Sequence, residues 1–144
     1  MLMQNPLNEY GLAFPILECV HLGGIILGVG TAALVNFRLL GVGLTKKSAG
    51  QLWRDALPWT LGGLTLAIAS GLLLFSIDAE KYFSNAVFRM KMLALLLAIV
   101  FYFTAVRKAA AVKTPSPANS TIACISLGLW AAVPFGGIFI GYSV

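Results

Sequence analysis

The stretch LAFPILECVHLGGIILGVGTAALVNFRLL, residues 12–40, decides the fold, because it is apolar over almost its whole length. A helix needs about 20 residues to cross the ~30 Å hydrocarbon layer of a bilayer, and this stretch is long enough. Three more apolar segments follow, at residues 57–77, 87–106 and 122–144. Helices are expected, because isolated strands would leave unpaired backbone groups in lipid. The sequence therefore predicts an all-α integral membrane protein, an up-down four-helix bundle in a single domain, residues 1–144.

The composition agrees with a membrane location. The chain has 144 residues, of which 59% are hydrophobic and only 10% are charged, whereas a soluble domain carries roughly 25% charged residues. A soluble domain of this size has too much surface per volume to bury so much apolar side chain. The net charge of +5 does not indicate a nucleic-acid partner, because the basic residues are scattered between apolar blocks. We expect a multi-pass protein of a bacterial inner membrane.

The charges between the apolar segments predict an orientation. The first and third connections are basic, whereas the second mixes both signs and lowers the contrast. The basic residues of the first and third connections are Arg38, Lys46, Lys47, Arg54, Arg107, Lys108 and Lys113, and the one acid among them is Asp55. By the positive-inside rule these two connections are cytoplasmic, so both termini are periplasmic. Within the third connection, residues 114–120 have the composition of a turn.

The first apolar segment contains two ionisable side chains that bear on function. Glu18 and His21 are three residues apart, so they share one face of a helix. Ionisable groups inside a membrane are costly and usually mark a bundle interior or a functional site. Gly24 and Gly28 continue nearly the same face. They predict either close helix–helix packing, which the glycines alone favour, or a groove for a flat cofactor.

His21, the single histidine of the chain, has three interpretations. It makes a structural hydrogen bond, it ligates haem iron, or it binds copper, zinc or a proton. Haem is supported by depth, because His21 lies roughly 14 Å below the start of the segment, and Arg89 and Lys91 begin the third segment at a similar level. Arg89 is the expected propionate partner, although it could instead extend to the lipid headgroups or pair with Glu18. The second ligand is left open among Met90, Met92, Tyr82, Tyr102, a second copy of the chain or an empty position.

A family resemblance rests on the first segment and the turn after it. Phe14-Pro15-Ile16-Leu17-Glu18-Cys19-Val20-His21-Leu22-Gly23, followed by Gly30 and Arg38-Leu39-Leu40-Gly41, resembles a bacterial family of small four-helix membrane proteins of unknown function. Asn36-Phe37 before the arginine departs from its pattern. The resemblance marks Glu18, His21 and Arg38, and it implies no activity.

Three functional hypotheses follow. The leading one is a b-type haem protein for electron transfer or small-molecule redox chemistry, with His21 as axial ligand and Glu18, Gly24, Gly28 and Arg89 around the haem. The first alternative is a copper protein that uses Glu18 and His21, and the second is a non-catalytic scaffold. Motifs of hydrolytic enzymes are missing from the sequence. We also expect a homo-oligomer formed through small-residue faces, at Gly63, Ala67, Ser70, Gly71, Gly137 and Gly141.

Overall fold

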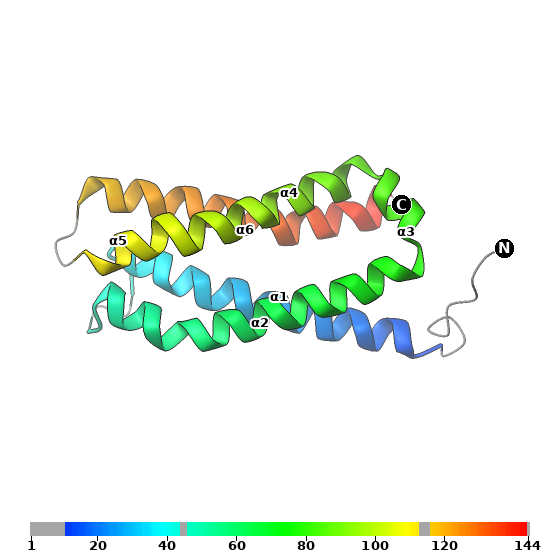
Figure 1. The fold of residues 1–144 in the computed structure, drawn as a ribbon, viewed down its shortest axis with the longest axis horizontal. Coiled ribbons are helices and arrows are strands. Elements are labelled where there is room, and N and C mark those ends of the chain that lie inside the picture. Colours follow the sequence, from blue (N-terminus) through cyan, green and yellow to red (C-terminus); the bar gives the residue numbers. More distant parts are fainter. Residues whose placement is uncertain (1–10, 44–45, 113–115, 144) are drawn as a thin grey trace.

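The protein is a bundle of four long helices that alternate in direction (Figure 1). The computed structural model describes residues 11–43, 46–112 and 116–143. The helices are α1 (Ala13–Leu39), α2 (Ala49–Ile77), α3 (Ala79–Ser84), α4 (Ala86–Phe101), the π-helical turn η2 (Tyr102–Val106), α5 (Arg107–Ala111) and α6 (Pro117–Ser143). Helices α4, η2 and α5 run on without a break, so the bundle has four spans. The beginning of α1 and the end of α6 lie at the same end of the bundle.

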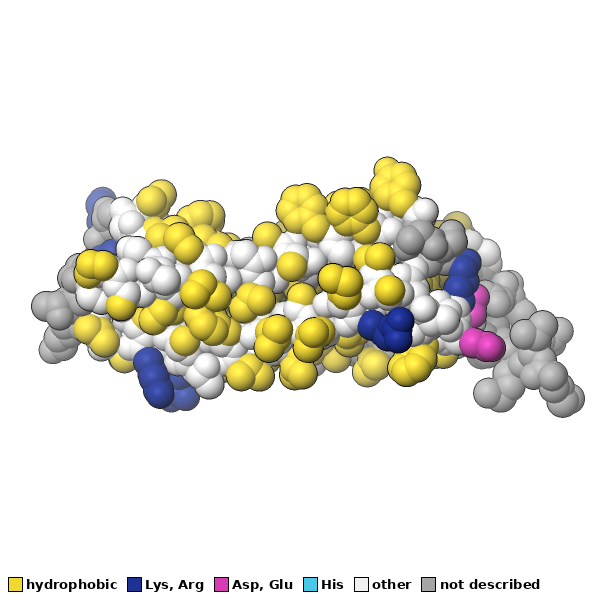
Figure 2. Space-filling view, turned by 90° about the horizontal axis from the view of Figure 1, so that it is seen from above, with side chains coloured by type: hydrophobic (Ala, Val, Ile, Leu, Met, Phe, Trp, Pro, Cys, Tyr) yellow, Lys and Arg dark blue, Asp and Glu magenta, His cyan; other side chains and the backbone are white. Residues whose placement is uncertain are grey.

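All four spans are long and apolar enough to cross a membrane. Large hydrophobic side chains cover the outside of the bundle along its length, and the acidic side chains in view gather at one end (Figure 2). Leu22, Ile26, Leu93 and Phe139 are each more than half exposed. Such a surface is compatible with lipid and not with water. The predicted all-α, multi-pass membrane fold is therefore confirmed.

The second helix begins earlier than its hydropathy predicts. The expected span was 57–77, whereas α2 starts at Ala49. Ser48 and Gln51 form a capping box, in which the Gln51 N–H donates to Ser48 Oγ at 3.2 Å and the Ser48 N–H donates to Gln51 Oε1 at 3.3 Å. The first two turns of α2 carry charged residues. Hydropathy therefore does not mark them as part of the span, although their backbone is helical.

The third and fourth helices are also longer than expected. The third span, predicted as 87–106, continues to Ala111, so Arg107 and Lys108 are helical and not part of a connection. The turn predicted at 114–120 is wrong for residues 117–120, because α6 begins at Pro117. Proline is favoured at the first position of a helix, where its missing N–H costs nothing. Residues 114 and 115 lie outside the described part of the chain.

Helix α1 ends in a Schellman motif. The Val42 N–H donates to Phe37 O at 2.9 Å and the Gly41 N–H donates to Arg38 O at 3.0 Å. Gly41 has a φ of 80°, which is strained for residues with a Cβ. The Arg-Leu-Leu-Gly block thus has a local physical reason: it stops α1 and turns the chain toward α2.

Helices α1 and α2 approach each other through glycine. A Cβ on Gly24 would lie 2.6 Å from Ala67 N, and one on Gly28 would lie 2.9 Å from Leu64 N. A Cβ on Gly63 would collide with the Gly28 backbone nitrogen. These distances are shorter than carbon contacts allow, so the backbones touch only because side chains are missing. Helix α2 covers the face of α1 that carries Gly24 and Gly28, so close helix packing accounts for these two glycines.

The small-residue faces expected to join two copies of the chain are largely used inside one chain. Gly63 and Ala67 face α1, and Ser70 and Gly71 contact His21. Gly141 has open space around it. Homo-oligomer formation remains a prediction, but most of the faces named for it are covered.

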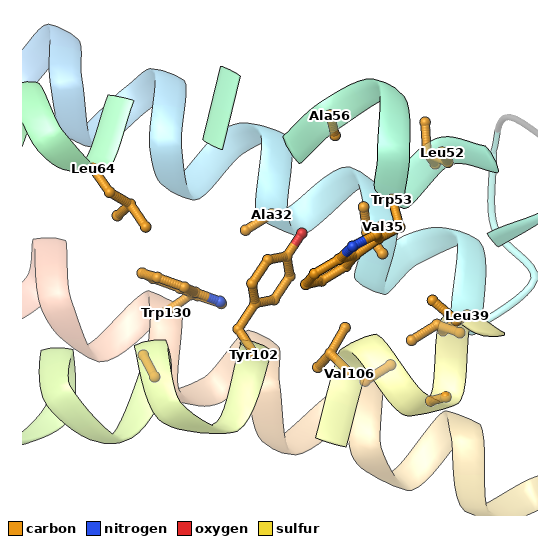
Figure 3. Close-up of a cluster of buried hydrophobic side chains, with 14 residues drawn as sticks. Ala32, Val35, Leu39, Leu52, Trp53, Ala56, Leu64, Tyr102, Val106 and Trp130 are labelled. Atoms are coloured by element: carbon orange, nitrogen blue, oxygen red, sulfur yellow. The ribbon is translucent and has the colours of Figure 1, made fainter. Parts of the chain in front are cut away.

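An aromatic cluster joins the two halves of the bundle (Figure 3). Tyr102 lies between Trp53 and Trp130, with ring centroids 4.6 Å and 5.8 Å away. The Trp130 indole nitrogen has no hydrogen-bond partner among the described residues. It points toward the nearly perpendicular ring of Tyr102, which can accept a weak N–H contact. This cluster fixes the α1–α2 pair against the α4–α6 pair.

The α1–α2 contact predicts a sharp difference between two neighbouring glycines. Gly63→Ala should destabilise the protein by about 1–3 kcal/mol, because its methyl group forces the backbones apart. Gly62→Ala adds the same methyl group where nothing lies within 4 Å, so its effect should be neutral or slightly stabilising. Unfolding in detergent, followed by circular dichroism, measures both. Equal effects of the two substitutions would contradict the contact.

Candidate functional site

His21 is held between α1 and α2 by one ring nitrogen. Its Nδ1 lies 2.7 Å from Ala67 O and 3.1 Å from Ser70 Oγ. The Ser70 hydroxyl donates its own hydrogen to Leu66 O at 2.6 Å, so toward His21 it can only accept. Because both partners of Nδ1 accept, Nδ1 carries the ring proton. In the neutral ring the lone pair then belongs to Nε2.

The imidazole rests on Gly71 of α2. A Cβ at Gly71 would lie 2.9 Å from Cε1 and 3.3 Å from Nδ1 of His21. His21 is half-buried, and its Nε2 has no hydrogen-bond partner among the described residues. Nε2 is also not sealed from the exterior, since it does not belong to the fully buried unpaired atoms. The ring is therefore fixed at one nitrogen and open at the other.

Lys91 of α4 is the charged group that approaches the histidine. It is half-buried and close enough for its ammonium charge to act on the His21 ring. Its side chain lies along α6, where a Cβ on Gly136 would be 3.1 Å from Lys91 Cβ and one on Gly137 would be 3.4 Å from Lys91 Nζ. All four spans thus contribute to this site, which we call the His21–Lys91 site.

Lys91 has no carboxylate partner in the part of the chain that the structure describes. The salt bridge found there joins Lys47 and Asp55, at 2.5 Å, near the opposite end of the bundle. A cation in an apolar interior without a counter-ion is costly. A bound anionic group would remove that cost.

The two charged residues that were predicted to act beside His21 lie on the surface. Glu18 and Arg89 are both exposed, and they form no ion pair with each other. Cys19 is also exposed. Of the two basic residues that begin the third span, Lys91 therefore enters the bundle and Arg89 does not. The sequence does not reveal this difference, because Lys91 lies between Met90 and Met92 in a segment that is apolar on all sides.

The candidate second ligands are either exposed or packed against aromatic rings. Met90 and Met92 are 70% and 43% exposed. Tyr102 is buried in the aromatic cluster, where its hydroxyl interacts with Thr60. Tyr82, in the short helix α3 outside the spans, packs against both Phe75 and Phe88, which stack on each other. Burial raises the pKa of Tyr82, and the carboxylates of Glu18 and Asp78 raise it further; Glu18 thus lies near Tyr82 at the end of the bundle.

The donor set limits what the site can bind. Among residues 11–43, 46–112 and 116–143, no three side chains of His, Cys, Asp or Glu gather in one place. A copper site built from Glu18 and His21 would need further ligands from elsewhere. Haem iron needs a single axial histidine, since the macrocycle supplies four nitrogens. A histidine fixed through Nδ1 to a backbone carbonyl, with Nε2 open, is the usual arrangement of an imidazole that ligates a metal.

The cost of burying Lys91 predicts that its removal stabilises the fold. Lys91→Met keeps a long unbranched side chain and removes the charge, so it should raise the free energy of unfolding by about 1–3 kcal/mol. Arg89→Met at the exposed surface should change it by less than about 0.5 kcal/mol. Thermal and denaturant unfolding in one detergent compare them. Destabilisation by Lys91→Met would mean that Lys91 already has a favourable partner.

Comparison with known proteins places the chain in a family and in no functional class. No curated protein matches it, and no solved structure matches it. Residues 8–143 match a family described only as a family of unknown function, DUF6644. Because the match covers nearly the whole chain, this protein belongs to the family of unknown function DUF6644.

Proposed function

We propose that this membrane protein binds a b-type haem through Nε2 of His21 and serves in electron transfer or small-molecule redox chemistry. The observation that carries the proposal is the fixed imidazole. Nδ1 lies 2.7 Å from Ala67 O and 3.1 Å from Ser70 Oγ. The electron pair of Nε2 is therefore free to bind iron. A hydrogen bond from the ring nitrogen that does not bind the metal orients a metal-ligating histidine and raises its basicity.

Lys91 supports the proposal through its charge. Haem carries two propionates, and the half-buried Lys91 ammonium group, which has no carboxylate partner among the described residues, is suited to bind one of them. Lys91 takes this role in place of Arg89, because Arg89 lies on the exposed surface. The face that carries Gly24 and Gly28 is covered by α2, so the macrocycle would lie on the Lys91 side of His21. There the α1–α2 pair faces the α4–α6 pair.

The orientation of the bundle belongs to the same proposal. The described basic residues at the end of α1, around the beginning of α2 and in α5 stand at the end of the bundle opposite to the beginning of α1. By the positive-inside rule that end is cytoplasmic. His21, early in α1, then lies in the outer half of a bacterial inner membrane, and a redox partner would approach from the periplasm.

The chemistry that a bound haem would support depends on whether its iron has a second axial ligand. Met90 and Met92 are exposed, and Tyr102 is held in the aromatic cluster. His21 would therefore hold the iron, and a small molecule or a second chain would supply any further ligand. A five-coordinate centre would favour small-molecule chemistry over simple electron transfer.

Haem binding predicts a visible spectrum. Protein purified in mild detergent from haem-sufficient cells should show a Soret band and a pyridine hemochrome of the b type. His21→Ala should lose the band because it removes the axial ligand. Lys91→Gln should weaken haem retention by about tenfold, because one charge-assisted hydrogen bond is lost. Arg89→Gln is the matched control and should retain haem like the unmodified protein.

The outcome against haem is equally clear. If the purified protein shows no Soret band, and if titrated hemin shows no Soret shift relative to hemin in detergent alone, the haem proposal fails and the structural and copper interpretations of His21 remain. Circular dichroism of His21→Ala then tests the structural role, because loss of the Ala67 and Ser70 contacts should lower the stability of the α1–α2 pair. An unfolded His21→Ala protein would be replaced by His21→Gln, which can still hydrogen-bond to Ala67.

A further inference from the structure

A basic cavity lies at the end of the bundle opposite to the His21–Lys91 site. It is enclosed by the end of α1, the beginning of α2, α5 and the beginning of α6, and its volume is about 680 Å³. Three arginines from three different helices line it, namely Arg38, Arg54 and Arg107. Leu39, Leu57 and Trp53 form an apolar wall beside them. We call this space the arginine cavity.

The positive charge of the arginine cavity is not neutralised by the protein. Asp55 is the sole acidic residue in the sequence between residues 38 and 77, and no acidic residue follows residue 107. Asp55 pairs with Lys47 at 2.5 Å. Among the described residues Arg38 bonds through its Nε, which donates to Lys47 O at 2.7 Å. The terminal amino groups of its guanidinium donate to no described group.

The positive ends of two helix dipoles border the same space. Ser48 and Gly50 bring the first turn of α2 to the cavity, and Ser116 and Asn119 bring the first turn of α6. The positive ends of helix dipoles favour an anion there. Asn119 is only 8% exposed. Its Oδ1 accepts from Ser116 Oγ at 3.4 Å, and its Nδ2 donates to no other described group, so a buried amide remains for a ligand.

We propose that the arginine cavity binds a phosphate group, as carried by the headgroup of an acidic phospholipid or by a soluble phosphate. Guanidinium groups match phosphate oxygens in pairs, and three arginines line this one cavity beside two helix N-termini. The cavity lies where the spans end, at the level of lipid headgroups, and its apolar wall suits the glycerol and the first carbons of an acyl chain. The ordinary explanation of the arginines is that they orient the protein in the membrane, which requires only charge and no cavity.

The neighbouring residues Arg107 and Lys108 separate these explanations. Both are exposed cations at the same end of the bundle, but only Arg107 lines the cavity. In nanodiscs of phosphatidylcholine with added phosphatidylglycerol, native mass spectrometry should detect retained phosphatidylglycerol on the full-length protein. Arg107→Gln should weaken this binding about tenfold, and Arg54→Gln should act similarly. Lys108→Gln should leave it within about twofold, because Lys108 does not line the cavity and an exposed charge outside the site contributes little.

A second arm identifies the source of the phosphate. Inorganic phosphate is titrated into protein in phosphate-free detergent, and thermal stability is recorded. Stabilisation by inorganic phosphate at low concentration, with no preference for phosphatidylglycerol, assigns a soluble phosphate; the reverse pattern assigns a lipid. Arg107→Lys retains the charge without the paired geometry and replaces Arg107→Gln if the latter does not fold. Equal losses in Arg107→Gln and Lys108→Gln, or no response to either probe, would overturn the proposal.

Discussion

The contact between the backbones of α1 and α2 is the constraint on which the rest of the structure depends. Lipid provides no hydrophobic force to join helices, so α1 and α2 associate through close packing of their surfaces. Gly24, Gly28 and Gly63 permit that packing because any Cβ among them would collide with the opposite backbone. His21 lies one turn before Gly24, so the same contact brings its ring to Ala67 and Ser70. The orientation of the imidazole is a consequence of the glycine contact.

Glycine serves a second purpose in this bundle, which is to make room for polar side chains. The His21 ring lies on Gly71, and the Lys91 chain lies on Gly136 and Gly137. One residue type thus produces backbone contact in one place and a space for an ionisable group in another. Which of the two occurs depends on what the facing helix presents.

The fold could be predicted from the sequence more completely than the site. The lengths of the apolar segments were enough to predict the four spans. The first helix was predicted almost to the residue, because Ala13–Leu39 lies within the expected 12–40. The early start of α2 was missed because its first turns are charged, although Ser48 and Gln51 carry a recognisable capping box. Helix ends depend on local hydrogen bonds, and hydropathy does not report them.

The interior of the site could not be predicted for a different reason. In a soluble helix the polar face marks the outside, but in lipid both faces are apolar, so periodicity does not separate interior from surface. Arg89 and Lys91 therefore looked equivalent, and Arg89 was assigned to the site although it is exposed. His21 was found because it is the single histidine in an apolar segment. Small residues on the facing helix were the other indication of an inward-facing side chain. Gly136 and Gly137 of α6 are the ones that accommodate Lys91.

The aromatic cluster explains why Lys91 faces inward despite its cost. Ala98 and Tyr102 lie seven and eleven residues after Lys91, which places all three on one side of an α-helix. From Ala98 the buried positions continue in two four-residue steps, to Tyr102 and Val106. Those steps would drift by about 80° on an α-helix of 3.6 residues per turn. The wider π-helical turn at Tyr102–Val106 offsets this drift and keeps both residues in the core. Because packing around Tyr102 fixes the rotation of the whole span, Lys91 is carried into the bundle.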